Sequence, residues 1–321
     1  MDNLFDKGFW AKISKSVYGF DYVNVGIGEI GKKYSFTIIN FPVVNYKKMI
    51  CMPYVAHSNI ELEGKQRTCL DFEKFIIETA RDRKIRIIEI RSREKLPLDW
   101  QVSTKHVTFL IDLTNGYENL FNKMHNNVRT AIRKGYKNNL KHEFGLQLFD
   151  GFYSIYSRSV KKLGTPVHSE NFFREILKTG YFNILTVFTS DGTPISSVLF
   201  GFDETTLYPL WGGGLADYRD LSGDNFKYWE LVKYACERNF NWFDFGRSTR
   251  GSGTAFFKSR WASEERQLYY YFYDTKRTLS VQKSKNYLKN DLLESFFIKT
   301  WSKFPLFLTN FLGPHLRKYI P

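Results

Sequence analysis

The sequence predicts an α+β fold in two domains, with mixed, mainly antiparallel sheets flanked by helices. Short runs rich in aromatic and β-branched residues, typical of strands, alternate with segments whose apolar residues follow helical spacing. In the second half, helices come first, then a hairpin with a neighbouring strand, and finally a strand–helix–strand unit. The 321 residues are compatible with two domains as readily as with one.

The first domain is expected over residues 1–105, in a strand–strand–helix–strand order. In the helical segment, Phe72, Phe75, Ile76 and Ala80 follow helical spacing. The predicted strands cover residues 34–41, 46–52 and 85–90, and the predicted helix covers residues 72–84. Pro97-Leu98-Asp99-Trp100 ends this core.

The second domain is expected over residues 106–275 and opens with a strand over 107–113. Asn115 with Glu118 three residues later resembles a capping box, so a single helix is predicted from there to about residue 138. Asp191-Gly192 is the strongest hairpin signal in the chain. The remaining expected elements are helices over 152–163, 171–178 and 224–238, and strands over 182–189, 195–202, 206–211, 241–245 and 267–273.

The tail over residues 276–321 alternates apolar clusters with basic residues, most clearly from 292 onward. Two interpretations stay open for residues 292–321. They form an amphipathic segment that makes peripheral contact with a membrane, or a tail packed on the domain surface.

The charge balance favours anionic partners. Lys and Arg number 47 against 33 Asp and Glu, a net charge of +14. Such a balance suits tRNA, nucleotides, lipid pyrophosphates or an acidic membrane face without choosing among them. Three cysteines are too few for a disulfide framework. No signal-peptide pattern and no apolar run near the ~18 residues of a membrane span are seen. We therefore expect a cytoplasmic protein, including the inner face of the membrane as a location.

Several kinds of catalytic site are disfavoured by residue spacing. The six histidines show no H-x-H or H-E-x-x-H pattern, so no metal site is expected. No G-x-S-x-G elbow and no P-loop occur. The remaining possibility is chemistry that depends on positioning and proton transfer.

The most informative segment runs from Phe243 to Ala262. A strand delivers Asp244, and a loop rich in glycine, hydroxyl residues and arginine then leads to Phe257-Lys258. Glycines let backbone N–H groups approach a ligand, and arginines grip phosphate or carboxylate with paired hydrogen bonds. The segment predicts a site for an anionic, acyl-bearing substrate; a solvated hairpin loop is the alternative. Its predicted substrate-binding residues are Arg247, Ser248, Thr249, Gly253 and Phe257.

Six segments, in order, resemble the FemAB-related acyltransferases, which have the GNAT-type fold, and within them the branch associated with exopolysaccharide export and PEP-CTERM sorting. The segments are Met52-Pro53-Tyr54-Val55, Glu89-Ile90-Arg91, Asn127 to Lys134, Leu163 to Val167, Tyr228-Trp229-Glu230 and Phe243 to Trp261. The resemblance implies two tandem GNAT-type domains, the first a degenerate copy. The sequence departs from the family at His57-Ser58-Asn59 and at the three glycines after Trp211.

The resemblance assigns roles to individual residues. Lys258 matches the lysine of the family's Phe-Lys pair and is expected to be the catalytic group that stabilises charge. The alternative is that it is a solvated surface lysine. Asp244 is expected to act as a base or to orient Arg247. The alternative is a purely structural ion pair with a neighbouring arginine. The anion-binding residues are expected to be Arg129 and Arg133, and the residues lining the cleft Trp211 and Tyr218.

The implied activity is transfer of an aminoacyl or acyl group to an amine of a lipid-linked or nucleotide-linked glycan precursor, in peptidoglycan or exopolysaccharide biosynthesis. No permanently bound cofactor is expected; the donor is aminoacyl-tRNA or acyl-CoA. The usual R/Q-x-x-G-x-G/A loop for CoA is not met, and Asp220 and Asp224 repel phosphate, which favours aminoacyl-tRNA. The alternatives are an acyl-CoA-dependent sugar N-acyltransferase and a non-catalytic RNA- or membrane-surface-binding protein.

Overall fold

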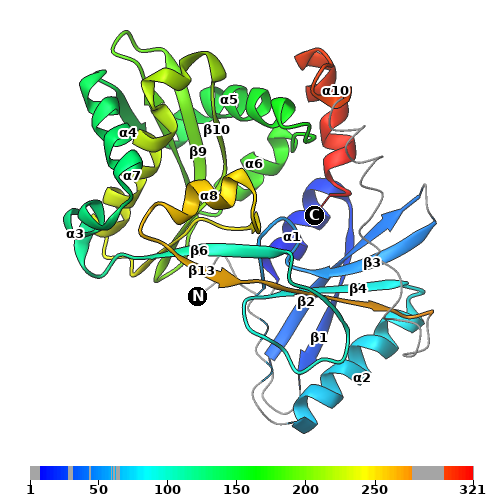
Figure 1. The fold of residues 1–321 in the computed structure, drawn as a ribbon. Helices are drawn as coiled ribbons and strands as arrows, with labels where there is room; N and C mark the ends of the chain where they lie inside the picture. The colour runs from blue at the N-terminus through cyan, green and yellow to red at the C-terminus, as the bar shows by residue number, and fades with distance from the viewer. Residues whose placement is uncertain are drawn as a thin grey trace. The chain divides into compact units, whose positions relative to one another are not determined.

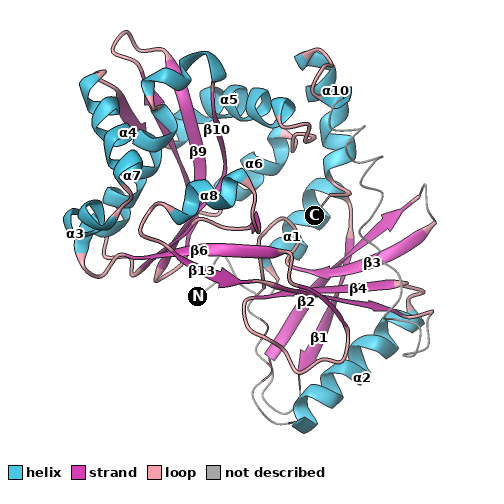
Figure 2. Ribbon diagram, viewed as in Figure 1, coloured by secondary structure: helices cyan, strands magenta, loops and turns pink. Residues whose placement is uncertain are grey.

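The computed structural model describes residues 8–27, 32–42, 45–58, 60, 62, 66–276 and 300–320. These residues divide into two compact units. The described residues up to Val107, with 266–276 and 319–320, form the first unit, and Thr108–Glu265 with 300–318 form the second. The α+β class and mainly antiparallel sheets predicted from the sequence are confirmed (Figures 1 and 2).

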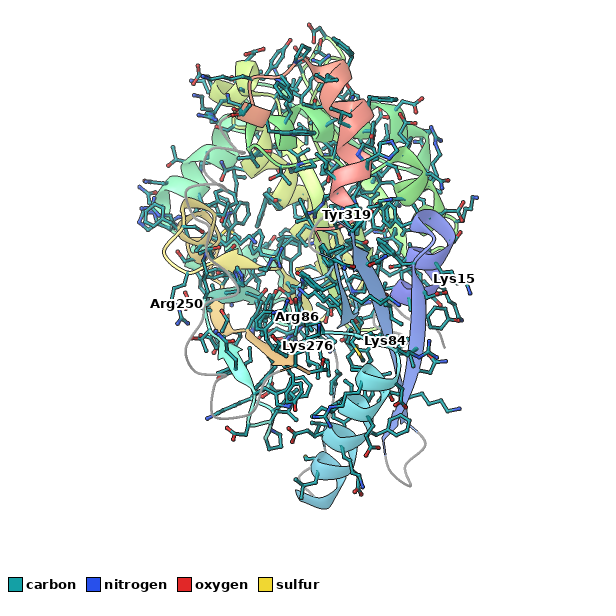
Figure 3. The ribbon with its side chains drawn as sticks, turned by 90° about the vertical axis from the view of Figure 1, so that its right-hand side faces the viewer. Lys15, Lys84, Arg86, Arg250, Lys276 and Tyr319 are labelled. Carbon is teal, nitrogen blue, oxygen red and sulfur yellow. The ribbon has the colours of Figure 1, made fainter. Side chains whose placement is uncertain are left out.

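The first unit is built on a six-stranded sheet in the order β1-β2-β3-β4-β14-β5. β3 and β4 are parallel and joined through helix α2, and the other neighbours are antiparallel. The bounds are α1 Phe9–Tyr18, β1 Asp21–Ile27, β2 Lys32–Phe41, β3 Tyr46–Cys51, α2 Gln66–Asp82, β4 Ile87–Ser92, β5 Gln101–Ser103 and β14 Tyr269–Asp274. Near the end of the chain, the ring of Tyr319 packs against Phe20 and Phe41 of this unit (Figure 3).

The position of β14 corrects the expected domain boundaries. The sequence assigned this strand to the second domain, but in the structure it pairs with both β4 and β5 of the first sheet. Tyr270, Tyr271 and Tyr273 are all buried, and pairing on both edges satisfies the backbone hydrogen bonds of the strand. The order of strands along the chain does not determine that β14, which follows the second domain, pairs with the first sheet.

The second unit is built on a sheet in the order β12-β6-β11-β10-β9-β8-β7, with β13 also paired to β6. Helices α4 and α7 cover one face of its central strands and α5 the other (Figure 1). The strand bounds are β6 His106–Asp112, β7 Lys141–Phe144, β8 Phe182–Phe188, β9 Pro194–Phe202, β10 Thr206–Gly214, β11 Trp242–Asp244, β12 Ser248–Thr249 and β13 Glu264–Gln267. The helix bounds are α3 Gly116–Lys123, α4 Asn126–Lys137, α5 Phe149–Lys162, α6 Glu170–Leu177, α7 Gly223–Glu237, α8 Gly253–Ser259 and α10 Leu306–Arg317, with 3₁₀ turns at Leu146–Leu148 and η2 Ala216–Leu221.

The single helix predicted from residue 115 to 138 is wrong, because the structure breaks it into α3 and α4. Met124 between them has an extended backbone. His125 then caps α4, since its Nδ1 accepts a hydrogen bond from the backbone N–H of Asn127 at 3.3 Å. A histidine cap is less common than a serine or aspartate cap, and the apolar spacing continues across the break.

Residues 300–318 of the tail belong to the second unit and pack on it. Arg317 Nε of α10 donates to Nε2 of the buried His168 at 3.0 Å, and Lys161 Nζ donates to Ser302 O at 3.1 Å. A Cβ at Gly313 would lie 2.7 Å from Val167, so this helix approaches the unit closely. Residues 277–299, which include part of the predicted amphipathic segment, and Asn59 lie outside the described residues.

Candidate functional site

The candidate site lies where β10 and β11 of the second unit separate. The two parallel strands pair over Thr206–Leu207 and Trp242–Phe243. After Pro209, β10 shifts register and continues beside β9 to Gly214, whereas β11 ends at Asp244. Ligands of open sheets bind outside the carboxyl ends of strands, where neighbouring connections diverge. The separation therefore marks the end of the sheet at which a substrate would be held.

The glycines that end β10 are required by close packing. A Cβ on Gly213 would lie 2.3 Å from Cβ of Ser159 on α5, and one on Gly214 would lie 2.6 Å from Oδ2 of Asp224 on α7. Both distances are too short for any side chain. The sequence departure after Trp211 thus lets helices on both faces of the sheet approach the end of β10.

A pocket of about 180 Å³ opens at the start of α7. It brings together Tyr218 of η2 and Phe257 of α8, which the sequence analysis had assigned to one site. Its lining residues are Ile195, Ser196, Gly214, Leu215, Tyr218, Arg219, Ser222, Gly223, Asp224, Asn225 and Phe257.

A buried lysine, Lys227, lies behind the pocket and binds two of its lining residues, Ser196 and Asp224. Lys227, with a side chain 2% exposed, donates to Asp224 Oδ1 at 2.7 Å, to Ser196 Oγ at 2.9 Å and to Gly213 O at 3.3 Å. Burial alone would raise the pKa of Asp224, but Lys227 and Ser196 hold that pKa below its usual value. Asp224 therefore places a carboxylate in the first turn of α7, where a helix favours negative charge.

Lys258 is held at the end of β11 by backbone carbonyls. Its Nζ donates to Gly246 O at 2.8 Å and to Arg247 O at 3.2 Å. Burial lowers the pKa of Lys258 to about 8; Asp244 opposes this shift and Arg247 adds to it. A lysine with such a pKa changes protonation near neutral pH, as groups that transfer protons must.

Asp244 is buried, 1% exposed, and fixed by two hydrogen bonds. Its Oδ1 accepts from the hydroxyl of Thr108 on β6 and, at 2.8 Å, from the backbone N–H of Gly246. Gly246 turns the chain through a left-handed conformation, with φ 70°. Asp244 thus fixes the turn that carries the two carbonyls bound by Lys258, and its nearby charge acts on that lysine.

With this geometry described, the chain can be compared with known proteins. Residues 122–259 match the family model of the acetyltransferase (GNAT) domain. They form a GNAT domain. No curated protein sequence matches the chain.

Three solved structures resemble the whole chain in fold. FemX has 13% sequence identity and a TM-score of 0.66, with 88% of this chain and 95% of FemX covered. L-PGS from Bacillus licheniformis has 9% identity and a TM-score of 0.58, with 94% of each chain covered. The C-terminal domain of a putative lysylphosphatidylglycerol synthetase from Agrobacterium fabrum has 11% identity and a TM-score of 0.54, with 83% of this chain and 92% of that one covered. The GNAT-type fold predicted from the sequence is confirmed; the relation to the FemAB group and its exopolysaccharide branch stays a prediction.

Two arginines share one face of α4 in the GNAT domain. Arg129 is half-buried, and its Nε has no hydrogen-bond partner among the described residues. Arg133, one turn later, is exposed and lies over the ring of Phe121 at 5.3 Å. The backbone N–H of His125, just before α4, donates to Arg260 O at 3.0 Å, so the start of α4 lies beside the turn that follows α8.

Trp211 lies apart from the pocket at α7, although the sequence analysis placed it with Tyr218. It is buried and packs edge-on against the rings of Phe172 and Phe173 of α6. The bulge before Trp211 rotates its side chain relative to the rest of the strand. The structure gives Trp211 a packing role in the GNAT domain.

The remaining predicted loop residues differ in exposure. Arg247 and Gly253 are exposed, Thr249 is half-buried, and Ser248 is buried with no partner for its Oγ among the described residues. An unpartnered buried hydroxyl requires an explanation, and a bound ligand is one. The segment is also not one continuous loop, since Ser252 accepts from Ala255 N at 3.2 Å and starts α8.

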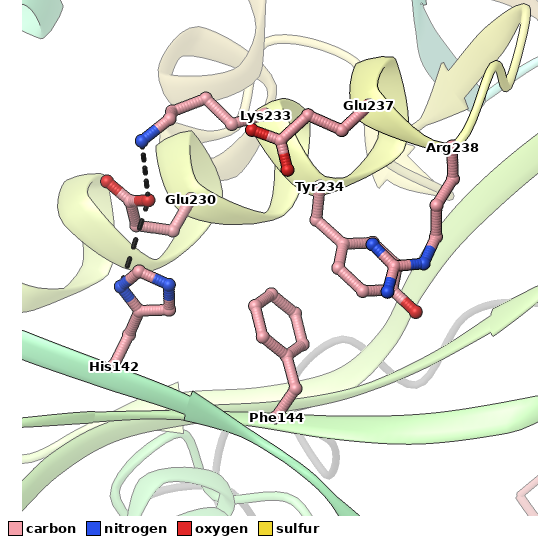
Figure 4. A pocket seen from close by; sticks show the side chains of 7 residues that line it. All are labelled: His142, Phe144, Glu230, Lys233, Tyr234, Glu237 and Arg238. Atoms are coloured by element: carbon pink, nitrogen blue, oxygen red, sulfur yellow. Dashed lines mark hydrogen bonds and ion pairs between the residues drawn. The ribbon is translucent and has the colours of Figure 1, made fainter.

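A second pocket of the GNAT domain, about 290 Å³, lies at the C-terminal half of α7 (Figure 4). Glu230 there is buried, accepts from Tyr136, and pairs with Lys233 at 3.0 Å and with His142 at 3.7 Å. Its charge is thus already compensated by neighbouring side chains. Glu230 of the Tyr228-Trp229-Glu230 segment therefore has a structural role here.

The described residues contain neither a metal site nor a membrane-spanning helix. No group of three or more His, Cys, Asp or Glu side chains is placed to hold a metal ion. No described helix has both the length and the apolar character needed to cross a membrane.

The sequence analysis missed Lys227, the hydroxyl donor Thr108 and helix α8. The i, i+3 spacing of Asp224 and Lys227 was visible as a surface pair, but nothing in the spacing indicated that the lysine is buried. Ser252 followed by a helix-compatible run was a usable signal for α8.

Proposed function

We propose that the chain is an N-acyltransferase of the FemAB type, which transfers an aminoacyl or acyl group to an amine of a cell-wall or exopolysaccharide precursor. The observation that carries the proposal is Lys258, held by two carbonyls beside Asp244 at the separated strand ends and with a pKa lowered to about 8. Acyl transfer from an activated donor needs alignment, stabilisation of an oxyanion and removal of one proton.

In the proposed reaction, the acceptor amine attacks the carbonyl carbon of the donor and forms a tetrahedral oxyanion. The intermediate then collapses, the bond to the donor oxygen or sulfur breaks, and the proton lost by the amine ends on the departing oxygen or sulfur, which leaves as an alcohol or a thiol. The ammonium group of Lys258 stabilises the developing negative charge, and Asp244 fixes the turn that positions it. Phe257 and Tyr218 line the adjoining pocket, where the acyl group would lie.

For the donor, we propose aminoacyl-tRNA over acyl-CoA. The start of α7 is where a GNAT domain would receive a pyrophosphate, and here it carries the carboxylate of Asp224. Lys227 pairs with this carboxylate from the buried side, but Asp224 is 52% exposed and still presents negative charge to a phosphate group at this end of the helix. The description of the matched domain as an acetyltransferase favours the second candidate, an acyl-CoA-dependent sugar N-acyltransferase.

The donor is tested by thermal shift. If Asp224 excludes the pyrophosphate, acetyl-CoA at millimolar concentration leaves the melting temperature of the full chain unchanged. A ligand at ~100 times its Kd would stabilise the protein by about 2.7 kcal/mol, which the assay detects readily. Asp224→Asn removes the repulsion without removing bulk and serves as the paired variant. A clear shift of the native protein with acetyl-CoA, and none with aminoacyl-tRNA, would reverse the order of the two candidates.

Arg129 and Arg133 are proposed to hold the anionic part of a substrate. Arg129→Ala and Arg133→Ala are each expected to weaken binding of tRNA, used as the probe, by about tenfold, since each removes one charge-assisted contact. The slope of log affinity against log salt should flatten by about one. Lys134→Ala removes an exposed cation from the same helix and is the matched control. Equal losses in the control, or unfolding of both arginine variants, would remove these residues from the site.

Peripheral membrane contact is a proposal for the described tail. On α10, Phe307 and Phe311 are 74% and 69% exposed and one helical turn apart. Basic Lys303 and Lys318 flank them in the sequence. Apolar rings flanked by cations suit the boundary of an anionic membrane. This supports action on a lipid-linked acceptor at the inner face of the membrane.

A further inference from the structure

A basic cavity lies in the first unit, outside the GNAT domain, at the amino-terminal ends of β3 and β4. Its volume is about 630 Å³. Five cationic side chains line it. They come from the start of β3, from the end of α2 and the turn that leads to β4, and from the two residues that follow β14. They are Lys47, Arg81, Lys84, Arg86 and Lys276 (Figure 3 labels three of them). The other lining residues are Asn40, Asn45, Tyr46, Ile85 and Thr275.

The described residues that line this cavity carry positive charge only. No carboxylate occurs among its lining residues within the described part of the chain. Asp274 is buried next to Arg86 and accepts from Arg86 Nε at 3.4 Å. The other four cationic residues are exposed. Like charges brought around one cavity repel one another, and an anionic ligand relieves that repulsion.

One wall of the cavity is rigid. The guanidinium of Arg86 lies over the ring of Tyr46 at 5.9 Å, and Tyr46 stacks on Phe41 with ring centroids 5.1 Å apart. Asp274 fixes the same arginine from behind. A pre-oriented guanidinium suits a phosphate group, which it binds with paired hydrogen bonds.

Lys84 occupies a position that usually favours glycine. It ends α2 in a left-handed conformation with φ 55°, where its N–H donates to Arg81 O and the N–H of Ile85 donates to Ala80 O. Glycine or asparagine adopts this conformation with less strain. A lysine at such a position is explained if its ammonium group is needed in the cavity.

We propose that this cavity binds a ligand carrying two or more phosphate groups, such as a nucleoside diphosphate or a diphosphate headgroup. Its volume is in the range of small-molecule sites. Five cations around one concave space match the charge of a diphosphate, and the Tyr46 ring with Asn40 and Asn45 offers contacts for the attached group. This site lies entirely in the first unit and does not depend on the function proposed for the GNAT domain.

The test is isothermal titration of the full chain with inorganic pyrophosphate and with uridine diphosphate. Both are expected to bind saturably at one site. Lys84→Gly should weaken binding by about tenfold, the loss for one charge-assisted contact, while the melting temperature holds or rises because glycine relieves the strain. Arg81→Ala should weaken binding similarly. Arg83→Ala removes an exposed arginine two residues away that does not line the cavity, and should change nothing.

A second experiment measures binding of the protein to vesicles that carry a polyprenyl diphosphate. Binding that is lost in Lys84→Gly would show that the site accepts the diphosphate of a lipid headgroup. Three results would overturn the proposal: no saturable binding of either probe, equal weakening by Arg83→Ala, or full affinity in both Lys84→Gly and Arg81→Ala. If RNA or anionic phospholipid vesicles bound through these residues and neither small probe did, the proposal of a diphosphate site would be wrong. The residues would then belong to an extended anion-binding surface.

Discussion

Replacing Lys258 by methionine is expected to lower kcat by ~10² or more, as the loss of one oxyanion-stabilising donor does in other enzymes. Methionine keeps most of the bulk of the side chain and removes the charge that binds Gly246 O and Arg247 O. KM should change less, because the interaction matters most where charge develops in the transition state. The measurement is steady-state kinetics on the acceptor that the proposed activity identifies.

The pH dependence separates catalysis from structure. With a pKa of about 8, the ammonium form of Lys258 predominates below pH 8 and is lost as the pH rises through that value. The rate should therefore fall on the alkaline side with an apparent pKa near 8, and Lys258→Arg should keep activity to higher pH. If Lys258→Met kept full turnover, Lys258 and the segment that carries it would not belong to the active site. The GNAT fold would then be the remaining argument for acyl transfer.

Trp261→Ala is expected to destabilise the GNAT domain by about 3–5 kcal/mol, the usual cost of truncating a buried aromatic side chain. Trp261 is 0% exposed and packs against Tyr228, Phe245 and Phe257, with ring centroids 5.8–6.1 Å apart. Its ring therefore joins α7, the segment after β11 and α8. The measurement is the denaturant midpoint at constant m-value.

Two other variants make the Trp261 prediction specific. Trp261→Phe keeps an aromatic ring and removes an indole N–H that has no partner among the described residues, so its cost should be well below that of alanine. Trp242→Ala, at a tryptophan 36% exposed in the same domain, is the matched control and should cost less than the buried site. Equal losses at Trp242 and Trp261 would contradict the anchoring role.

Local signals predicted much of the second unit. Asp191-Gly192 gave the β8–β9 hairpin, because Gly192 adopts φ 87° at the turn. The spacing of apolar residues gave α5, α6 and α7 within a few residues. Helix α1 and strand β1 were missed, although Gly19, which adopts φ 70° at the C-cap of α1, was a usable helix stop signal.

The candidate site was predictable in composition and less so in geometry. Tyr218 and Phe257 were assigned to one site and do line one pocket, whereas Trp211 faces the aromatic side chains of α6. A register shift of one residue in β10, between Pro209 and Trp211, decides this. Proline inside a strand is typical of a bulge, but it does not indicate which way the following side chain points. The burial of Lys227 depends on the approach of α7 to Gly213 and Ser196, a contact between distant parts of the sequence.

The return of β14 to the first sheet has a consequence for synthesis on the ribosome. β4 and β5 have both been synthesised once residue 103 is added, yet the strand that lies between them ends at Asp274. At bacterial or eukaryotic elongation rates the interval is on the order of 10 s. The nascent segment up to residue 103 therefore waits with two open strand edges while the GNAT domain is translated, and this interval is where chaperone protection would matter most.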